Sequence, residues 1–416
     1  MRPECLRKCC QADAVLLAKS RAVTAPRTGR RALGSRLALT QALSFLGIGI
    51  SLPFLPLWLD SRGFDDVTIG WLLTIPILMR VAASPFVSGL GDGRVAPVRL
   101  LACLNAIAAL LYLALLPASG VWSIAALLAL SAIALSGVVP LIDMLTIAQI
   151  RAGAAVDYGH VRLWGSVAFL AANIAGGYWI AADGARIVPV ALALSAGMAG
   201  AAALAAPAAP AAATPIGRTA EAPSAGFGEA FWLVLAAAAF VHASHAAIYA
   251  FGSLHWRGQG VSEPGIGMLW AVGVAAEIGV FLLAGGVVAR GVAGLWLMAL
   301  GAGAAAVRFA LMALDPGFVG AILLQVLHGL SFGGMHLGVM AVMSSLAPDG
   351  RRAAAQGRLT ATGALASAVA TLLSGYLYRR YGVGVFLAMT ALALAGLALV
   401  LLAKRRLHGD TVRQGQ

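Results

Sequence analysis

Residues 207–230 read PAAPAAATPIGRTAEAPSAGFGEA, and this stretch decides how the chain is organised. It is rich in Pro and Ala, and it holds no apolar run of the about 20 residues that a membrane-spanning helix requires. On each side of it lie six apolar stretches of roughly that length. We therefore expect a linker between two six-helix bundles.

The twelve stretches are too long for strands of a membrane barrel, which have about 10 residues of alternating polarity. They cover residues 37–59, 67–90, 100–116, 121–150, 163–182, 187–206, 231–256, 265–289, 291–314, 318–346, 359–378 and 383–403. The chain of 416 residues is 61% hydrophobic and 11% charged, whereas soluble domains are about 45–50% apolar and about 25% charged. This composition excludes a soluble or disordered chain and predicts an all-α integral membrane protein.

The basic residues indicate the orientation. With both termini in the cytoplasm, 22 of the 29 Lys and Arg residues fall in cytoplasmic tails and loops, and five fall in the opposite loops. The positive-inside rule therefore predicts cytoplasmic termini. The same distribution explains the net charge of +13, so no nucleic-acid partner is expected. Residues 1–36 are expected to be a disordered basic cytoplasmic tail, and residues 404–416 a second cytoplasmic tail.

An internal repeat supports two equivalent bundles, over residues 37–206 and 231–403. At an offset of 197 residues, Leu57-x5-Gly63-x2-Asp66-x2-Ile69-Gly70 matches Leu254-x5-Gly260-x2-Glu263-x2-Ile266-Gly267. The same offset places Arg80 opposite Glu277. Parallel six-helix repeats of this kind resemble the major facilitator superfamily, in which two halves rock about a site near the midplane.

A shorter motif lies between the second and third stretches and reads Ser88-x-Leu90-x-Asp92-x-Arg94. It resembles the cytoplasmic gating motif of that superfamily, with Ser88 in place of the usual Gly. The resemblance implies that Asp92 and Arg94 help to latch the halves in one state. Helix dipoles permit this role, because a carboxylate is stabilised at a helix N-terminus.

Ionisable side chains within the stretches, together with Arg162 at the start of the fifth, are the main functional candidates, because each charge in a span costs about 2.5–3.5 kcal/mol on insertion scales. They are Arg80, Asp143, Arg162, Glu277, Arg308, His242, His245, His328 and His336. Arg80, Asp143 and Arg162 belong to the N-terminal half, and the others belong to the C-terminal half. One half is thus suited to hold an anion, and the other to handle a proton.

Histidine changes its charge near neutral pH, so Glu277 with His328 or His242 is a candidate proton site. Other interpretations stay open. Glu277 and Arg308 could form a structural ion pair, and each histidine could make a structural hydrogen bond between helices. His242 and His245 have the spacing of metal ligands, but no carboxylate or Cys accompanies them, and no metal or cofactor is expected.

Asp143 follows Pro140 by three residues. A proline within a helix removes a backbone hydrogen bond and bends the helix. We expect a kink here that opens backbone groups toward a cavity.

Five segments carry a closer resemblance. They are Asp157-Tyr158-Gly159-His160-Val161-Arg162-Leu163-Trp164-Gly165-Ser166-Val167-Ala168-Phe169, Ile77-Leu78-Met79-Arg80, His245-Ala246-Ala247 with Tyr249 and Trp256, Leu269-Trp270-Ala271-Val272-Gly273-Val274-Ala275-Ala276-Glu277, and Leu324-Gln325-Val326-Leu327-His328. They resemble the bacterial 3-phenylpropionate/cinnamate transporters, a branch of the major facilitator superfamily near the lactose permease and the nucleoside–proton symporters.

The likeness to the lactose permease implies residue roles. Asp143 and Arg162 stand where that family keeps a substrate-binding carboxylate–arginine pair. Glu277, Arg308 and His328 match its proton-coupling network.

Two positions depart from that pattern. Ser331 stands where the permease has its proton-carrying Glu, and Gly363 stands about where it has a Lys. We therefore expect Glu277 to carry the proton instead.

The leading hypothesis is a proton-coupled symporter that imports a small aromatic acid by alternating access. The substrate carboxylate would pair with Arg80 or Arg162, and Tyr249 and Trp270 would cover the ring. Glu277, Arg308, His328, His242 and His245 form the expected proton-coupling set. The expected partners are the substrate, protons and the lipid bilayer of a bacterial inner membrane, with the protein acting as a monomer.

Two alternatives belong to the same superfamily: a sugar or nucleoside symporter that uses Asp143 and Arg162, and a drug exporter. A membrane sensor or an intramembrane enzyme is disfavoured by the sequence. No phosphate-binding loop, His-Glu-x-x-His or Gly-x-Ser-x-Gly motif occurs, and no loop is long enough for an output module.

Overall fold

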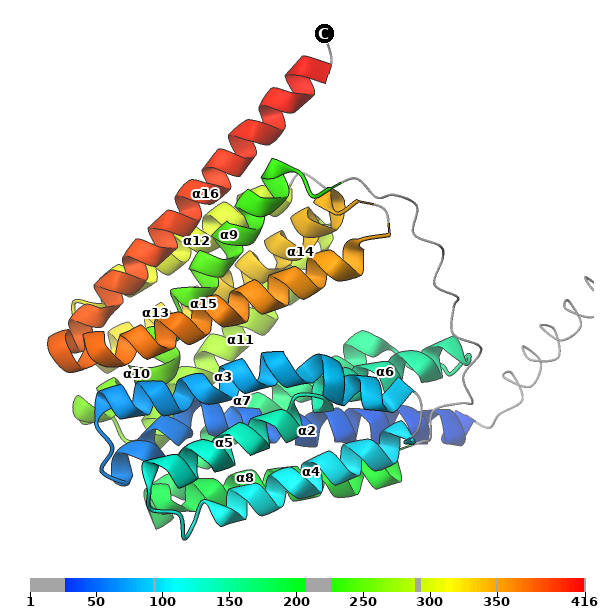
Figure 1. The fold of residues 1–416 in the computed structure, drawn as a ribbon, viewed down its shortest axis with the longest axis vertical. Helices are drawn as coiled ribbons and strands as arrows, with labels where there is room; N and C mark the ends of the chain where they lie inside the picture. Colours follow the sequence, from blue (N-terminus) through cyan, green and yellow to red (C-terminus); the bar gives the residue numbers. More distant parts are fainter. Residues whose placement is uncertain (1–26, 93–94, 207–225, 289–292, 349, 415–416) are drawn as a thin grey trace, which may run out of the picture.

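The computed structural model describes residues 27–92, 95–206, 226–288, 293–348 and 350–414 (Figure 1). Within these ranges the chain is helical and contains no β-strand. The first half contains α2 (Arg27–Ser61), α3 (Asp66–Gly89), η1 (Leu90–Asp92), α4 (Pro97–Ala114), α5 (Val121–Leu135), α6 (Val138–Arg151), α7 (Tyr158–Asp183), η2 (Ala185–Ile187) and α8 (Val188–Ala205). The second half contains α9 (Glu229–Ala243), α10 (Ala246–Gly258), α11 (Glu263–Val288), α12 (Ala293–Met312), α13 (Gly317–His328), η3 (Gly329–Gly334), α14 (Met335–Leu346), α15 (Arg352–Tyr381), η4 (Gly382–Gly384) and α16 (Val385–Gln414).

The membrane crossings agree with the apolar stretches. Eleven helical segments in the described ranges are long and apolar enough to span a membrane. The last of them, Arg352–Leu407, contains both α15 and α16, which reverse direction at Gly382–Gly384 (Figure 1). The described ranges therefore contain twelve crossings, and the predicted all-helical multi-pass membrane fold is confirmed.

The first and last helices extend beyond the corresponding apolar stretches. Helix α2 begins at Arg27, ten residues before the first stretch, and α16 continues to Gln414. Residues 1–26 of the expected basic tail and residues 207–225 of the expected linker lie outside the described residues.

Three crossings are interrupted within the span. Helices α5 and α6 are separated at Ser136–Gly137, which is where the missing N–H of Pro140 leaves the Ser136 carbonyl without its helical partner. Helices α9 and α10 are separated at Ser244–His245, and the Ser244 hydroxyl donates to the Val241 carbonyl at 2.6 Å. Between α13 and α14 the segment Gly329–Gly334 is a π-helix, a form often found at functional sites.

The two bundles meet along α3 with α15 and along α7 with α11. Glycines allow both pairs to approach closely. A Cβ atom on Gly70 would lie 3.1 Å from the Cα atom of Gly375, and one on Gly267 would lie 2.2 Å from the Asn173 carbonyl oxygen. Gly70 and Gly267 occupy the same position of the 197-residue repeat. The repeat thus provides two equivalent glycine-lined helix crossings.

These crossings lie at one side of the molecule. We define the linker side as the side where α8 ends and α9 begins, and the opposite side as the other. At the opposite side, Arg257 forms an ion pair with Asp60, and Arg379 Nη1 lies 3.3 Å from Asp65 Oδ2. Toward the linker side, α3 and α15 diverge (Figure 1). The bundles are therefore joined at the opposite side and separate toward the linker side.

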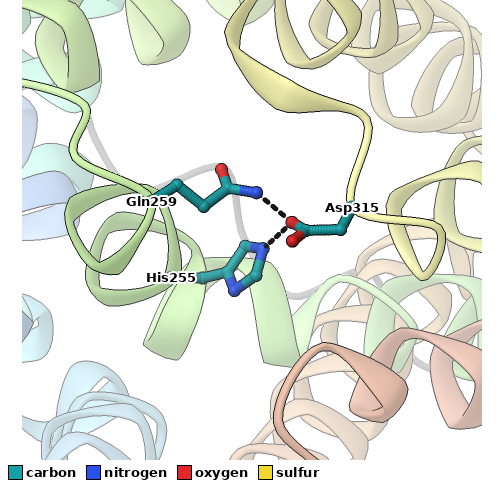
Figure 2. A network of polar contacts seen from close by, with 3 residues as sticks. All are labelled: His255, Gln259 and Asp315. Atoms are coloured by element: carbon teal, nitrogen blue, oxygen red, sulfur yellow. Dashed lines mark hydrogen bonds and ion pairs between the residues drawn. The ribbon is translucent and has the colours of Figure 1, made fainter.

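A polar network supports this junction from within the second half. His255 Nε2 lies 2.9 Å from Asp315 Oδ1, and the Gln259 amide also donates to this carboxylate. Figure 2 shows His255 of α10 and Gln259, the residue directly after α10, directed at Asp315 in the turn between α12 and α13. The network fixes the end of α10 that carries Arg257.

Candidate functional site

Arg162 lies in the second turn of α7, close to the interface with α2. The helix is capped by Asp157, whose carboxylate accepts from the His160 backbone N–H at 2.6 Å. The Arg162 guanidinium lies over the Phe45 ring of α2, 4.6 Å from its centroid. Its Nη1 atom is buried and has no hydrogen-bond partner among the described residues.

Asp143 of α6 is the nearby carboxylate of the same bundle. It is half-buried, interacts electrostatically with Arg162 and accepts a hydrogen bond from Tyr158. In the described part of the chain, no ion pair joins Asp143 to Arg162. The N-terminal bundle thus presents a cation that a direct salt bridge does not neutralise.

Glu277 and His336 face Arg162 from the other bundle. Each interacts electrostatically with Arg162. Counted from the close contact of Asn173 with Gly267, Arg162 lies about 16 Å along α7 and Glu277 about 15 Å along α11, at 1.5 Å per residue. The two side chains therefore lie at the same depth between the bundles.

Arg308 of α12 is buried within the C-terminal bundle, with 1% of its surface exposed. Its Nη1 donates to His328 Nδ1 at 3.1 Å, and its Nη2 donates to Gln325. Gln325 in turn donates to the Leu269 carbonyl at 2.8 Å. Because Nδ1 of His328 accepts, the proton of its neutral ring lies on Nε2.

His245 lies at the interruption between α9 and α10. Its Nδ1 donates to the Val241 carbonyl at 2.9 Å, and its Nε2 accepts from the Ser331 hydroxyl at 3.2 Å. Ser331 therefore links the interrupted crossing to the π-helical segment. Both ring nitrogens of His245 are engaged, which counts against a metal site with His242. Among the described residues, no group of three His, Cys, Asp or Glu side chains could hold a metal.

Aromatic rings surround this network. Tyr249 stacks on Trp270 at 5.9 Å between centroids, and His328 stacks on Phe332 at 5.3 Å. The Trp270 indole donates to Ser253 at 2.9 Å, which fixes the ring. Tyr249 interacts electrostatically with both Glu277 and Arg308.

The two remaining histidines of the spans, His242 and His336, are exposed and interact electrostatically with each other. A Cβ atom on Gly363 would lie 3.7 Å from the His242 ring. Gly363, the α15 position that departs from the permease pattern, thus leaves room beside this ring.

The structure does not bring every predicted residue to one place. Arg80 is exposed on α3 and interacts electrostatically with Tyr112 of α4, and no contact between Arg80 and Arg162 is seen among the described residues. Glu277 and Arg308 form no ion pair within the described ranges. Of the gating motif, Asp92 ends η1, its side chain is outside what is described, and Arg94 lies outside the described residues.

Several residues at the site were not selected from the sequence. Phe45 and Gln325 contact the two arginines, and Tyr158 contacts Asp143. Gln41 of α2 is buried, and neither of its amide atoms has a partner in the described ranges. For Gln41 and Gln325 the sequence offered one usable signal, because an amide side chain within an apolar span requires a hydrogen-bond partner.

Two six-helix bundles joined at one side, with charged groups facing each other between them, define a transporter of the major facilitator type. The chain belongs to the family described as "MFS_1 like family", whose model matches residues 35–389. Members of this superfamily are membrane transporters and not enzymes.

Individual relatives agree with this assignment. The "Probable 3-phenylpropionic acid transporter" of Escherichia coli (strain K12) is 30% identical over 377 residues, which cover 87% of this chain and 96% of that protein. The structure of the nucleoside transporter NupG matches with a TM-score of 0.73 at 16% identity, over 89% of this chain and 98% of that chain. A bacterial homolog of the human lysosomal transporter Spinster, in an inward-facing and occupied conformation, matches with a TM-score of 0.73 at 14% identity, over 92% of this chain and 98% of that chain. The two solved structures support the fold alone.

Proposed function

We propose that the protein is a proton-coupled symporter that imports a small aromatic carboxylate across the bacterial inner membrane. The observation that carries the proposal is Arg162, a guanidinium between the bundles with a buried Nη1 that finds no partner in the described chain. A buried donor without an acceptor is unfavourable, and a substrate carboxylate would supply one. The relative at 30% identity bears the name of a phenylpropionic acid transporter, which supports this class of substrate.

The residues suggest separate roles for the two halves. Arg162 binds the carboxylate, and Phe45 from α2 with Tyr249 and Trp270 from the second half offers aromatic surface to the ring. Glu277, at the same depth across the gap, takes up the proton. Binding of an anion to Arg162 weakens the attraction between Arg162 and Glu277, which favours protonation of Glu277. This linkage couples the two ligands.

Alternating access follows from the two glycine-lined crossings. With cytoplasmic termini, as the basic residues predict, the structure represents the state open to the cytoplasm. Rocking of the bundles about the α3–α15 and α7–α11 crossings would open the opposite side and close the linker side. We propose that a monomer carries out this cycle.

Uptake of labelled 3-phenylpropionate into proteoliposomes that contain the purified chain tests the proposal. We expect uptake that rises when the outside is made more acidic than the inside. The neutral analogue 3-phenylpropanol should compete poorly. Uptake that ignores the pH gradient would contradict proton coupling, and competition by sugars or nucleosides in place of aromatic acids would contradict the substrate class.

A further inference from the structure

Gln41 is a buried amide in the N-terminal bundle, with 1% of its surface exposed. Both Nε2 and Oε1 lack a hydrogen-bond partner in the part of the chain that the structure describes. Two other buried amides, by contrast, have partners. Asn105 donates to the Leu101 carbonyl at 2.8 Å, and Gln325 contacts both Arg308 and Leu269. A buried amide without partners destabilises the folded protein.

The position of Gln41 connects it to Arg162. Gln41 and Phe45 are one helical turn apart on α2, so they share a face. Both press against Gly165 of α7, where a Cβ atom would lie 3.3 Å from Gln41 Cγ and 3.1 Å from Phe45 Cδ2. Gly165 is three residues after Arg162 and therefore lies on the same face of α7. The Gln41 amide, the Phe45 ring and the Arg162 guanidinium thus occupy one stretch of the α2–α7 interface.

Three polar atoms in this stretch are unpaired among the described residues: Gln41 Nε2, Gln41 Oε1 and Arg162 Nη1. Two of them are donors, and they come from neighbouring helices. A carboxylate has two acceptor oxygens in one plane and readily takes two such donors. Asn173 also has an unpaired amide within the described ranges, but it lies at the crossing with Gly267, about 16 Å along α7 from Arg162.

We propose that Gln41 is a second carboxylate-binding residue, whose Nε2 donates to one oxygen of the substrate carboxylate while Arg162 Nη1 donates to the other. This inference rests on the proposed function and adds a residue to its recognition site. Since these atoms are buried, the half-buried Phe45 ring has to turn aside to admit the carboxylate. Substrate binding then replaces the contact of Phe45 with the guanidinium by hydrogen bonds.

The decisive variant is Gln41→Leu in the full chain, because leucine has a similar size and no polar atoms. Removing an unsatisfied buried group leaves stability unchanged or raises it, so the melting temperature without substrate should not fall. The KM for 3-phenylpropionate should rise about tenfold, since a hydrogen bond to a charged group is lost. The thermal stabilisation by 3-phenylpropionate should decrease in parallel. Asn105→Leu is the matched control, and its KM should equal that of the wild-type protein.

A folded Gln41→Leu protein with wild-type KM and wild-type stabilisation by 3-phenylpropionate would overturn the inference. If that variant does not accumulate in the membrane, Gln41→Asn makes the same test, because it keeps the amide but withdraws it by one methylene. An unchanged KM for Gln41→Asn would then overturn the inference. Failure of the wild-type protein to bind or transport any aromatic acid is a different result, which overturns the proposed function and this inference with it.

Discussion

The two halves of the molecule each hold an arginine in the interior, and they surround it differently. In the C-terminal half, Arg308 donates to His328 and to Gln325, and only its Nε lacks a partner among the described residues. In the N-terminal half, Arg162 has a phenylalanine ring beneath it and no direct ion pair within the described chain. One cation is held by the protein itself, and the other is left available.

This difference arises although the two halves are related by the 197-residue repeat. The repeat places glycines at equivalent crossings, and the ion pair between Asp60 and Arg257 joins positions exactly one repeat apart in number, 197 residues. The charges near the centre do not follow the repeat. Arg80 and Glu277 are equivalent in sequence, but only Glu277 faces Arg162. The halves share their hinges and have diverged in the chemistry between them.

The largest effect is expected at Arg308. Arg308→Leu leaves two buried acceptors, His328 Nδ1 and Gln325 Oε1, without their shared donor, and each unsatisfied buried acceptor costs about 1–3 kcal/mol of stability. We expect a large fall in the melting temperature of the purified protein in detergent. Arg162→Leu is the control, and it should melt close to the wild-type temperature. Equal melting of all three proteins would contradict a structural role for Arg308.

The second effect is on substrate affinity. Arg162→Ala removes the cation of the N-terminal half, and the loss of a charge-assisted pair should raise the KM for 3-phenylpropionate about a hundredfold. Uptake at several substrate concentrations measures this change. Arg186→Ala, which alters an exposed arginine at the opposite side, should keep the wild-type KM. A normal KM for Arg162→Ala would remove Arg162 from the site.

The third effect separates coupling from binding. Glu277→Gln cannot exchange a proton, so the accumulation of about tenfold per pH unit that one coupled proton supports should be lost. Exchange of labelled for unlabelled substrate should persist, because Arg162 is intact. Glu229→Gln, at an exposed carboxylate paired with Arg406, should accumulate substrate normally. If Glu277→Gln also accumulates normally, the proton is carried elsewhere.

Much of the fold could be predicted from the sequence because the membrane imposes simple rules. Apolar stretches of about 20 residues predicted all twelve crossings, and the break before α6 follows from the missing N–H of Pro140. The repeat predicted two equivalent bundles, whereas the role of its Gly70 and Gly267 in the helix crossings emerged only from the structure. Interruptions without a proline, such as the π-helix after His328, depend on packing and could not be inferred.

The site was less predictable. The cost of inserting a charge into the membrane singles out the charged residues of the spans as candidates. The rotation of each helix about its axis then decides which groups these residues face. Arg80 or Arg162 was expected to bind the substrate carboxylate, and in the structure Arg80 is exposed on α3 and interacts electrostatically with Tyr112. The partner of Arg308 is an uncharged amide, Gln325, and the orphaned amide beside Arg162 is Gln41. Uncharged side chains in apolar runs carry a weak signal, so packing alone identifies them.

A smaller effect is expected at the junction of the two halves. Arg257 and Asp60 are both partly exposed, and such ion pairs contribute about 1 kcal/mol or less. Asp60→Asn should therefore shift the equilibrium between the state open at the linker side and the state open at the opposite side only a few-fold. The shift should favour the state open at the opposite side. Labelling of a cysteine introduced at Ser61 measures this shift. Asp183→Asn, an exposed carboxylate of the same side, should leave the labelling rate unchanged.

The smallest effect concerns the pH dependence of the same junction. The Thr68 backbone N–H donates to Asp65 at 2.8 Å and, with its side chain and Arg379, holds the pKa of this carboxyl below its usual value of 3.8. A lowered pKa in the folded state means that the contribution of Asp65 to stability is fully present above pH 3.8 and declines as the pH falls below that value. The contribution of Asp65 to closure at the opposite side should thus stay constant from about pH 5 to 8. The labelling rate of Ser61→Cys should rise only in more acidic buffer, and Asp65→Asn should remove that rise. An Asp65-dependent change of the labelling rate near pH 7 would contradict a lowered pKa for this carboxyl.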